Sequence, residues 1–454
     1  MAIREFDILM IGGGPAMRNC NKMCRTMNSD VSIGLIRTDK SMINHCAMPY
    51  VLDRSTILEK VIIPDQFLTK WNAELFIDQA KRIDIKDKIV TCANDRFRYK
   101  KLFLLTGAEP VKPPIPGIGL KNIFTLRKTE NIEELDRVLD LPQIKNVVIV
   151  GGGYIGAEFG YLIKKRGGLN VTIVELLKHL LEASLDDEFC IFAEEELKRK
   201  GVNCYTKSKV VEFKGKDTVE AIILDDGRKV SADVVILAMG VKPEIALALE
   251  AGIKANKEGI EVDKYMRTSV EDVYAAGDVI NTVSAVTGEY FPGRLGGNAV
   301  IQANVAAINA LGGNRIFPGV VNASATKVFD LSFGMVGFTE RYLKDRAVKY
   351  LTGNGETTSI YSMIPGSRPV KSKLIFREDD LTLIGAQVVG DTNLAGHLDE
   401  IAQAILKKFN LYDILSFHYT THPELSPEPR ANIWVSAAED LWKRVKRTLK
   451  LESG

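Results

Sequence analysis

The chain contains the stretch Val147-Val148-Ile149-Val150-Gly151-Gly152-Gly153-Tyr154-Ile155-Gly156, in which an apolar run leads directly into a glycine-rich turn. A buried strand that ends in such a turn and opens a helix directs backbone N–H groups and a helix N-terminus at a pyrophosphate. Gly151, Gly153 and Gly156 occupy the three glycine positions that supply the tight turn, the backbone approach and the close helix packing. The stretch therefore predicts a dinucleotide-binding α/β domain.

The strand after this turn indicates which dinucleotide binds there. The apolar residues Val171 to Val174 are followed by Glu175. A carboxylate at this position accepts hydrogen bonds from a ribose 2′-hydroxyl and repels a 2′-phosphate. Leu176 and Leu177 come next, so no arginine follows that would bind a phosphate. We therefore expect NADH rather than NADPH.

An earlier glycine-rich turn, Gly12-Gly13-Gly14-Pro15-Ala16, follows the apolar run Ile8 to Ile11. It is incomplete, because Met17 occupies the third glycine position and Arg37 stands where a ribose carboxylate is expected. Asp278 follows a run of small residues and is suited to hold a ribityl or ribose hydroxyl. An aspartate that caps the next turn gives the same pattern. Together these features favour a second dinucleotide.

One cysteine lies between the two turns. Cys46 stands in Asn44-His45-Cys46-Ala47-Met48-Pro49-Tyr50, and none of the 6 cysteines belongs to a Cys-x-x-Cys pair. A thiol between two dinucleotides suits a redox relay, whereas a thiol packed as a small hydrophobic group is the alternative. His45 is not expected to pair with Cys46, since adjacent side chains point apart. Histidines and cysteines show no metal-type spacing, and no metal is expected.

Composition places the chain among globular proteins of more than one domain. The 454 residues carry a formal net charge of +2, and basic residues form no block before the C-terminal tail, so nothing indicates nucleic acid. Charged residues among Met1 to Asp7 stand where a signal peptide needs an apolar stretch. No apolar run is long enough to span a bilayer. We expect a cytoplasmic enzyme.

An internal duplication divides the chain. Leu104-Leu105-Thr106-Gly107-Ala108 and Ile236-Leu237-Ala238-Met239-Gly240 both read as a strand closed by glycine, and the proline-rich stretch Pro110 to Gly117 between the blocks is typical of a linker. The predicted fold class is α/β, with two Rossmann-like nucleotide-binding domains and a C-terminal α+β domain. We assign residues 1–111 and 241–320 to the first domain, 112–240 to the second and 321–454 to the third.

The tail from Ala437 to Lys450 predicts an amphipathic helix. One side carries apolar residues, Leu441, Trp442, Val445 and Leu449, and the other carries basic residues, Lys443, Arg444, Lys446, Arg447 and Lys450. Docking on a membrane or a partner is one interpretation. We prefer a helix that packs on its own domain and leaves a solvated basic face.

The order of these segments resembles that of the FAD-dependent pyridine nucleotide-disulfide oxidoreductases. The shared segments are the two turns, the two strand–glycine closures and Val273-Tyr274-Ala275-Ala276-Gly277-Asp278, which together extend over nearly the whole chain. The segment around Cys46 resembles the single-cysteine segment of coenzyme A-disulfide reductases, NADH oxidases and NADH-dependent persulfide reductases. Lipoamide dehydrogenase and glutathione reductase carry a second cysteine where this chain has Val51, so the sequence excludes an internal disulfide beside the flavin.

The resemblance implies FAD at Gly12, Gly14 and Asp278, and NADH at Gly153, Gly156 and Glu175. Tyr154 would cover the flavin until the nicotinamide displaces it, Glu158 would lie near the nicotinamide, and Cys46 would lie over the opposite flavin face. The positive end of a helix that begins near Asn298 would point at the pyrimidine side of the flavin. Further cofactor contacts are expected at Pro15, Ala16, Arg37, Thr106, Gly107, Gly151, Ile155, Gly240, Gly277, Gly297 and Asn298.

Some positions depart from the family pattern. Because of Met17 and Arg37, we expect the adenosine end of FAD to be held differently. The segment from His422 to Glu428 resembles the one that carries the acid–base histidine in two-cysteine relatives, but Pro427 replaces the orienting glutamate. Single-cysteine relatives place a tyrosine near this point, and Tyr419 is available. Either His422 or Tyr419 would act across a homodimer interface.

The sequence thus predicts a homodimeric flavoenzyme that passes hydride from NADH to FAD, and then electrons through Cys46 to a small sulfur substrate. Coenzyme A disulfide and a coenzyme A persulfide are the expected substrates. An NADH oxidase or peroxidase, in which Cys46 cycles as a sulfenate, is the alternative among enzymes. An electron-transfer subunit that feeds a protein partner, with the basic tail helix as its docking element, is the alternative of another class.

Overall fold

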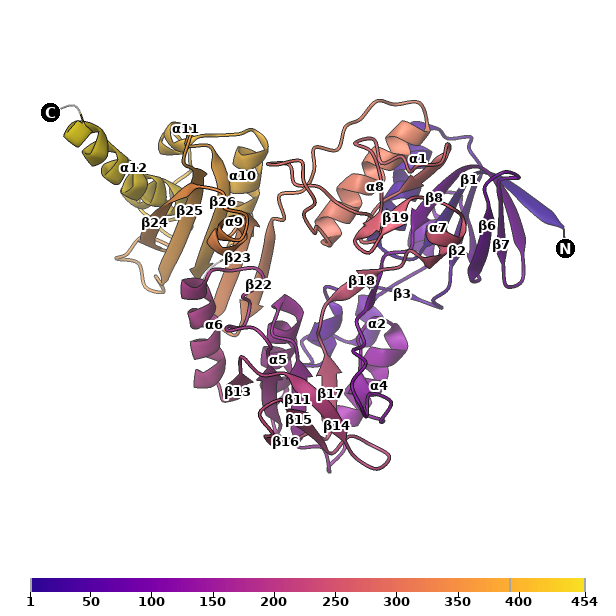
Figure 1. Ribbon diagram of the computed structural model, residues 1–454, viewed down its shortest axis with the longest axis horizontal. Helices are drawn as coiled ribbons and strands as arrows, with labels where there is room; N and C mark the ends of the chain where they lie inside the picture. The colour runs from indigo at the N-terminus through magenta and orange to yellow at the C-terminus, as the bar shows by residue number, and fades with distance from the viewer. Residues whose placement is uncertain (1, 392, 453–454) are drawn as a thin grey trace. The chain divides into compact units, whose positions relative to one another are not determined.

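The computed structural model describes residues 2–391 and 393–452, which cluster into two compact units (Figure 1). The first unit comprises the chain up to Pro114 together with Lys121–Ile144 and Met239–Val320. The second comprises Ile115–Leu120, Lys145–Ala238 and the chain from Val321 onward. The limits of the three predicted domains remain a prediction.

A seven-stranded sheet forms the centre of the first unit. Four of its strand pairs are parallel and two are antiparallel. Apolar residues of the parallel strands, such as Ile8 to Met10 and Leu102 to Leu104, are fully buried, as expected for strands covered on both faces. The strands are β1 (Ile3–Gly12), β2 (Ile33–Arg37), β5 (Glu74–Ile77), β6 (Ala80–Asp84), β7 (Ile89–Cys92), β8 (Arg96–Leu105) and β21 (Val273–Ala275).

Two helices of this unit pack against each other, α1 (Pro15–Met27) on β1 and α8 (Gly296–Ala310) on β21 (Figure 1). The smaller elements of this unit lie outside its seven-stranded sheet. They are β3 (Met42–Ile43), η1 (Met48–Val51), α2 (Leu58–Val61), β4 (Ile62–Ile63), α3 (Gln66–Thr69), β9 (Ala108–Pro110), β10 (Ile123–Phe124), α4 (Thr129–Leu139), β18 (Val241–Pro243), α7 (Ala246–Glu250), β19 (Ala255–Asn256) and β20 (Gly259–Ile260).

The second unit contains a parallel sheet in which the strand order is β17, β11, β12, β13. Helix α5 packs on β11 and β12, and α6 packs on β13. The elements are β11 (Asn146–Val150), α5 (Tyr154–Arg166), β12 (Asn170–Val174), α6 (Asp187–Arg199), β13 (Val202–Tyr205), an antiparallel ribbon of β14 (Val210–Lys214), β15 (Ala221–Leu224) and β16 (Lys229–Ser231), and β17 (Val234–Leu237).

The C-terminal part of this unit is an antiparallel sheet with the order β22, β23, β26, β25, β24. Helix α10 packs on β23 and β26, and α12 packs on β24 and β25 (Figure 1). The elements are β22 (Ser324–Val328), β23 (Leu331–Gly337), α9 (Glu340–Lys344), β24 (Tyr350–Thr358), β25 (Pro369–Arg377), β26 (Leu383–Gly390), α10 (Ala395–Leu406), α11 (Leu411–Leu415), η2 (Pro429–Ala431) and α12 (Ile433–Glu452).

The predicted fold class is confirmed: each glycine-rich turn connects a strand of a largely parallel sheet to a helix, and the C-terminal part forms an antiparallel sheet with helices. Helix α12 begins before Ala437 and buries Trp434 and Leu441, so it packs on its own sheet as preferred above. The side chains of Arg447, Leu449 and Lys450 lie outside the described residues. Within residues 2–391 and 393–452, no helix has both the length and the apolar character that a membrane span requires.

Candidate active site

The carboxyl ends of four strands bring the first group of predicted residues together in the first unit. Gly12, Arg37 and Leu105 end β1, β2 and β8, and Gly277 and Asp278 follow β21 shortly after its end. These strands are parallel neighbours, so their ends lie along one edge of the sheet. The predicted residues at this edge are Gly12, Gly14, Pro15, Ala16, Arg37, Thr106, Gly107, Gly277, Asp278, Gly297 and Asn298.

Close backbone approach explains two of these glycines. A Cβ on Gly12 would lie 2.2 Å from the carbonyl oxygen of Leu105, so only glycine fits beside β8. Gly277 has a φ of +84°, and its N–H donates to Oε1 of Gln302 at 2.9 Å. A Cβ on Gly277 would lie 3.3 Å from that of Ala16. The segment that carries Asp278 is therefore held against the start of α1.

Two helices of this unit begin at the edge with no acidic residue in their first turns. Gly14 caps α1, and a Cβ built on Gly14, Gly296 or Gly297 would meet no atom within 4 Å. The backbone N–H groups at these helix starts are therefore accessible, and the helix dipoles favour a negatively charged ligand there. Asn298 uses its amide to donate to the carbonyl of Gly293 at 2.9 Å.

Asp278 is an acidic group at this edge. Burial raises the pKa of its carboxyl above the usual value, although the nearby Arg294 and Arg127 act in the opposite direction. A carboxyl kept from water gains from hydrogen-bond donors that a ligand supplies. This setting suits a residue that binds a sugar or ribityl hydroxyl.

The remaining predicted glycines of this unit connect two short strands. Strand β9 pairs antiparallel with β18, so the two strand–glycine closures meet. Thr106 donates its hydroxyl hydrogen to the carbonyl of Glu244 at 2.9 Å, and the carbonyl of Gly240 accepts from Val111 N–H at 3.0 Å. Gly107 and Gly240 both have positive φ angles, +73° and +85°.

The second turn shows the close packing that its three glycines predict. A Cβ on Gly156 would lie 1.8 Å from the carbonyl oxygen of Gly151, so α5 starts in contact with the turn. The Glu175 carboxylate accepts the Gly152 N–H at 2.5 Å and the Leu177 N–H at 2.7 Å. These bonds fix the carboxylate at the mouth of the turn. Each carboxylate oxygen keeps a lone pair for a ligand hydroxyl.

Helix α5 carries three further predicted residues. The Tyr154 hydroxyl accepts a hydrogen bond from Ser324 Oγ at 3.4 Å, and burial raises the pKa of Tyr154 to about 12. Ile155 is 51% exposed, at the open start of the helix beside Gly153. Glu158 lies one turn further on and is half-buried.

Cys46 is exposed, just before the short helix η1. Its N–H donates to the side chain of Asn44 at 3.2 Å. The ring of His45 is engaged elsewhere, since its Nε2 lies 2.9 Å from the carbonyl oxygen of Arg127. Desolvation of the ring and the neighbouring Arg127 lower the pKa of His45, which keeps it neutral at pH 7. That His45 does not pair with Cys46 stays a prediction.

Other cysteines have the setting of inert thiols. Burial raises the pKa of Cys92 and of Cys190 to about 12, and burial also raises the pKa of Cys20. A thiolate is the reactive form, so these groups are unreactive at neutral pH. Cys46 differs from them by its exposure.

The two candidate acid–base residues lie in the exposed segment between α11 and η2. The hydroxyl of Tyr419 donates to the carbonyl of Pro429 at 2.5 Å. His422 accepts the N–H of Glu424 on its Nδ1 at 3.3 Å. Glu428, next to the expected orienting position, instead accepts from Ser362 Oγ at 2.8 Å.

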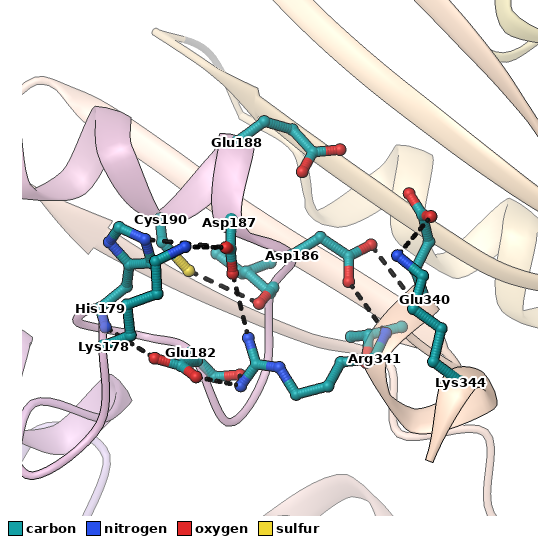
Figure 2. Close-up of polar contacts among 12 residues, drawn as sticks. Lys178, His179, Glu182, Asp186, Asp187, Glu188, Cys190, Glu340, Arg341 and Lys344 are labelled. Carbon is teal, nitrogen blue, oxygen red and sulfur yellow. Dashed lines mark hydrogen bonds and ion pairs between the residues drawn. The ribbon is translucent and has the colours of Figure 1, made fainter. Parts of the chain in front are cut away.

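Sequence reasoning missed a charged cluster in the second unit. Figure 2 shows Asp186 and Asp187, at the start of α6, facing Glu340 and Arg341 of α9. The carboxylates of Asp186, Glu188 and Glu340 are close enough together to hold a metal ion. The Lys373 ammonium contacts all three, however, and its side chain is only 2% exposed. A buried lysine therefore offsets part of the negative charge of this cluster, and nothing in the sequence of β25 distinguishes Lys373 from Lys371.

Residues 6–306 match the family model described as pyridine nucleotide-disulphide oxidoreductase. The chain belongs to this family. Residues 323–433 match the dimerisation domain of the same pyridine nucleotide-disulphide oxidoreductases, which confirms the predicted resemblance. The family cofactors are FAD and NAD(P)H. The strand ends at the first and at the second glycine turn both fit such a dinucleotide: each has an open N-cap glycine, a helix that starts without acidic residues, and a carboxyl group that can bind hydroxyls of the cofactor.

Known members of the pyridine nucleotide-disulphide oxidoreductase family match nearly the full length of the chain. An NADH oxidase from Methanocaldococcus jannaschii is 30% identical over 96% of this chain and 99% of its own. An NAD(P)H coenzyme A polysulfide/persulfide reductase from Pyrococcus horikoshii is 29% identical over 92% and 95%. The solved structure of an NAD-dependent persulfide reductase from A. fulgidus has a TM-score of 0.93, with 28% identity over 97% of this chain and 83% of its own.

Proposed function

We propose that this oxidoreductase uses NADH to reduce a small sulfur substrate, coenzyme A disulfide or a coenzyme A persulfide, through Cys46. The observation that carries the proposal is the exposure of Cys46 in the unit that holds the first dinucleotide edge, since the pKa values of Cys20, Cys92 and Cys190 are raised by burial. The names of the relatives from Pyrococcus horikoshii and A. fulgidus support this choice of substrate.

The predicted site residues bind the two cofactors at different places. Glu175 binds the ribose hydroxyls of NADH and disfavours a 2′-phosphate, while the open start of α5 receives the pyrophosphate. Gly12, Gly14 and Asp278 bind FAD, which when bound accepts hydride from NADH and passes electrons on to sulfur. Tyr154 and Glu158 line the nicotinamide end. The N-terminus of α8 stabilises negative charge on the flavin side of the site.

The chemistry on sulfur is a thiol–disulfide exchange at Cys46. The Cys46 thiolate attacks one sulfur of the substrate disulfide, forms a mixed disulfide and releases the other half as a thiolate. The electron pair that frees the second thiol comes from NADH. One disulfide, one NADH and one proton thus give two thiols and NAD+. His422 or Tyr419 supplies the proton to the leaving thiolate.

We further propose a cytoplasmic homodimer. The match of residues 323–433 to a dimerisation domain supports the dimer. A relay that works through a reduced thiol is favoured by a reducing compartment.

Cys46→Ser tests the proposal, because serine keeps the size of the side chain but forms no disulfide. We expect flavin reduction by NADH to survive in stopped-flow absorbance, and turnover of coenzyme A disulfide or persulfide to fall by several orders of magnitude. Cys204→Ser, at a half-buried thiol of the second unit, is the control and keeps wild-type turnover. Wild-type sulfur turnover in Cys46→Ser contradicts the relay and favours an electron-transfer subunit.

A second candidate is an NADH oxidase or peroxidase, favoured by the name of the relative from Methanocaldococcus jannaschii. In that case Cys46 cycles between thiolate and sulfenate. Mass spectrometry of the purified protein separates the two: a coenzyme A adduct on Cys46 supports the sulfur reductase, and a sulfenate supports the oxidase.

A further inference from the structure

Arg37 occupies, in the first sheet, the place that Glu175 has in the second. In the pairing of β1 with β2 the last partners are Ile11 and Ile36, and in that of β11 with β12 they are Val150 and Val174. In the first sheet Gly12 follows Ile11 and Arg37 follows Ile36. In the second sheet, in the same way, Gly151 follows Val150 and Glu175 follows Val174. The two side chains also lie against equivalent glycines: a Cβ on Gly13 would be 2.9 Å from Arg37 Cγ, and one on Gly152 would be 3.1 Å from Glu175 Cβ.

The guanidinium group of Arg37 is fully engaged by neighbouring groups. Only 1% of its side chain is exposed, and its two terminal nitrogens donate to the two oxygens of Asp65 at 2.7 and 3.2 Å. Its Nε donates to the carbonyl of Asp39 at 2.7 Å, and one terminal nitrogen also donates to the carbonyl of Lys40 at 2.8 Å. The guanidinium fork is thus closed by a carboxylate and is not open to a phosphate.

Asp65 keeps acceptor capacity on the outside of this pair. Its side chain is 46% exposed, and each oxygen, after accepting one hydrogen bond from Arg37, retains a lone pair. The carboxylate is fixed in direction by the bidentate contact. Glu175 lies directly beside the second glycine turn, whereas at the first turn Arg37 lies between the turn and the carboxylate of Asp65.

The start of α1 leaves room for this displacement. At the third glycine position of the second turn a Cβ would clash with Gly151 at 1.8 Å. The equivalent position of the first turn carries Met17, whose whole side chain is buried. A side chain at Met17 therefore needs room between α1 and its turn that α5 does not have at Gly156. More room at the turn agrees with an acceptor that lies further out.

We infer that Asp65, held by Arg37, replaces the missing ribose carboxylate and binds the adenosine ribose of FAD. The inference rests on the proposed binding of FAD at the first turn. Arg37 acts as a positioning residue: it screens the charge of Asp65 and aims its oxygens. The neutral pair favours a ribose that carries hydroxyls over one that carries a phosphate.

The test measures flavin affinity rather than turnover. Apoprotein is titrated with FAD and with FAD analogues that lack the 2′- or the 3′-hydroxyl of the adenosine ribose, and binding is followed by flavin fluorescence. For the wild type we expect at least one analogue to bind about tenfold more weakly than FAD, the effect of one hydrogen bond to a charged group. For Asp65→Asn we expect FAD to bind about tenfold more weakly, with the discrimination against that analogue lost.

Two further variants separate binding from folding. Asp30→Asn changes an exposed aspartate before the start of β2 and is expected to leave all affinities unchanged. Asp65→Glu keeps the ion pair with Arg37 but moves the carboxylate, so it remains informative if Asp65→Asn does not fold. Unchanged discrimination in either Asp65 variant overturns the inference, as does a wild type that binds FAD and both analogues equally. A wild type that binds no FAD refutes the proposed function instead.

Discussion

Replacing Lys373 with methionine is expected to destabilise the second unit by about 3–5 kcal/mol, the cost of removing one partner from a buried ion pair. The Lys373 ammonium lies 3.1 Å from Asp186 Oδ2 and 2.6 Å from Glu340 Oε1. The Asp186 side chain is 6% exposed. Methionine preserves the apolar stem of the lysine, so the change leaves packing intact and takes away only the positive charge.

The loss depends on pH in a direction that the structure determines. Burial acts to raise the pKa of Glu340, but the hydrogen bonds from Lys373 and Tyr350 outweigh it and hold the pKa below the usual value. A lowered pKa in the folded state stabilises the protein above the unfolded pKa, about 4.3, and this contribution is lost as the pH falls through the folded value. The difference between wild type and variant should therefore be largest at pH 7 and shrink below about pH 4.

Thermal unfolding followed by circular dichroism measures the effect. A loss of this size lowers the melting temperature of a unit of this length by roughly 6–20 °C. Lys371→Met is the matched control, because Lys371 lies on the same strand and pairs with Glu356 at 3.0 Å but is 45% exposed. A surface pair of this kind contributes up to about 1 kcal/mol. A loss below about 1 kcal/mol for Lys373→Met, or one that is no smaller well below pH 4 than at pH 7, refutes the reasoning.

Three further predictions concern the active site. The wild type should prefer NADH to NADPH by at least about tenfold in kcat/KM. Glu175→Gln should bring this ratio close to one, because it removes the charge that repels a 2′-phosphate. Equal use of NADH and NADPH by the wild type contradicts the assignment. Asp278→Ala should release FAD on dilution, with roughly tenfold weaker binding by fluorescence titration, and wild-type retention would reject this contact. At pH 7.5 iodoacetamide should alkylate Cys46 in the native protein. Cys92 and Cys190 should stay unmodified, because the pKa of each of these two thiols is raised to about 12. Mass spectrometry measures the modification, and an unmodified Cys46 argues against a relay.

Local spacing made much of the site predictable. Glu175 follows a strand that pairs with the strand before the glycine turn, so its place beside Gly152 depends on a short stretch of chain. Gly156 was recognisable because a tight strand–turn–helix joint allows no side chain there. The two strand–glycine closures were visible as well, but that β9 and β18 pair with each other depends on the fold.

Contacts between distant segments were not predictable from the sequence. Arg37 was recognised only as a departure, because its partner Asp65 belongs to a different element and no periodicity connects them. Lys373 alternates with Lys371 in β25, a pattern that usually indicates a solvent-facing side. The start of α6 and helix α9 cover that lysine and supply its carboxylates, which only the tertiary structure reveals.

The pairing of β8 with β21 has a consequence for biosynthesis. Lys101 and Asp272, which meet beside these strands, are 171 positions apart in the chain. At about 5–20 residues per second, a ribosome needs roughly 9–34 s to make the intervening segment. During that interval β8 lacks its neighbour β21, whereas β11, β12 and β17 are all made before β21 is reached. If the first edge binds flavin as proposed, its last strand is made after the strands of the second edge, so flavin is captured only late in synthesis.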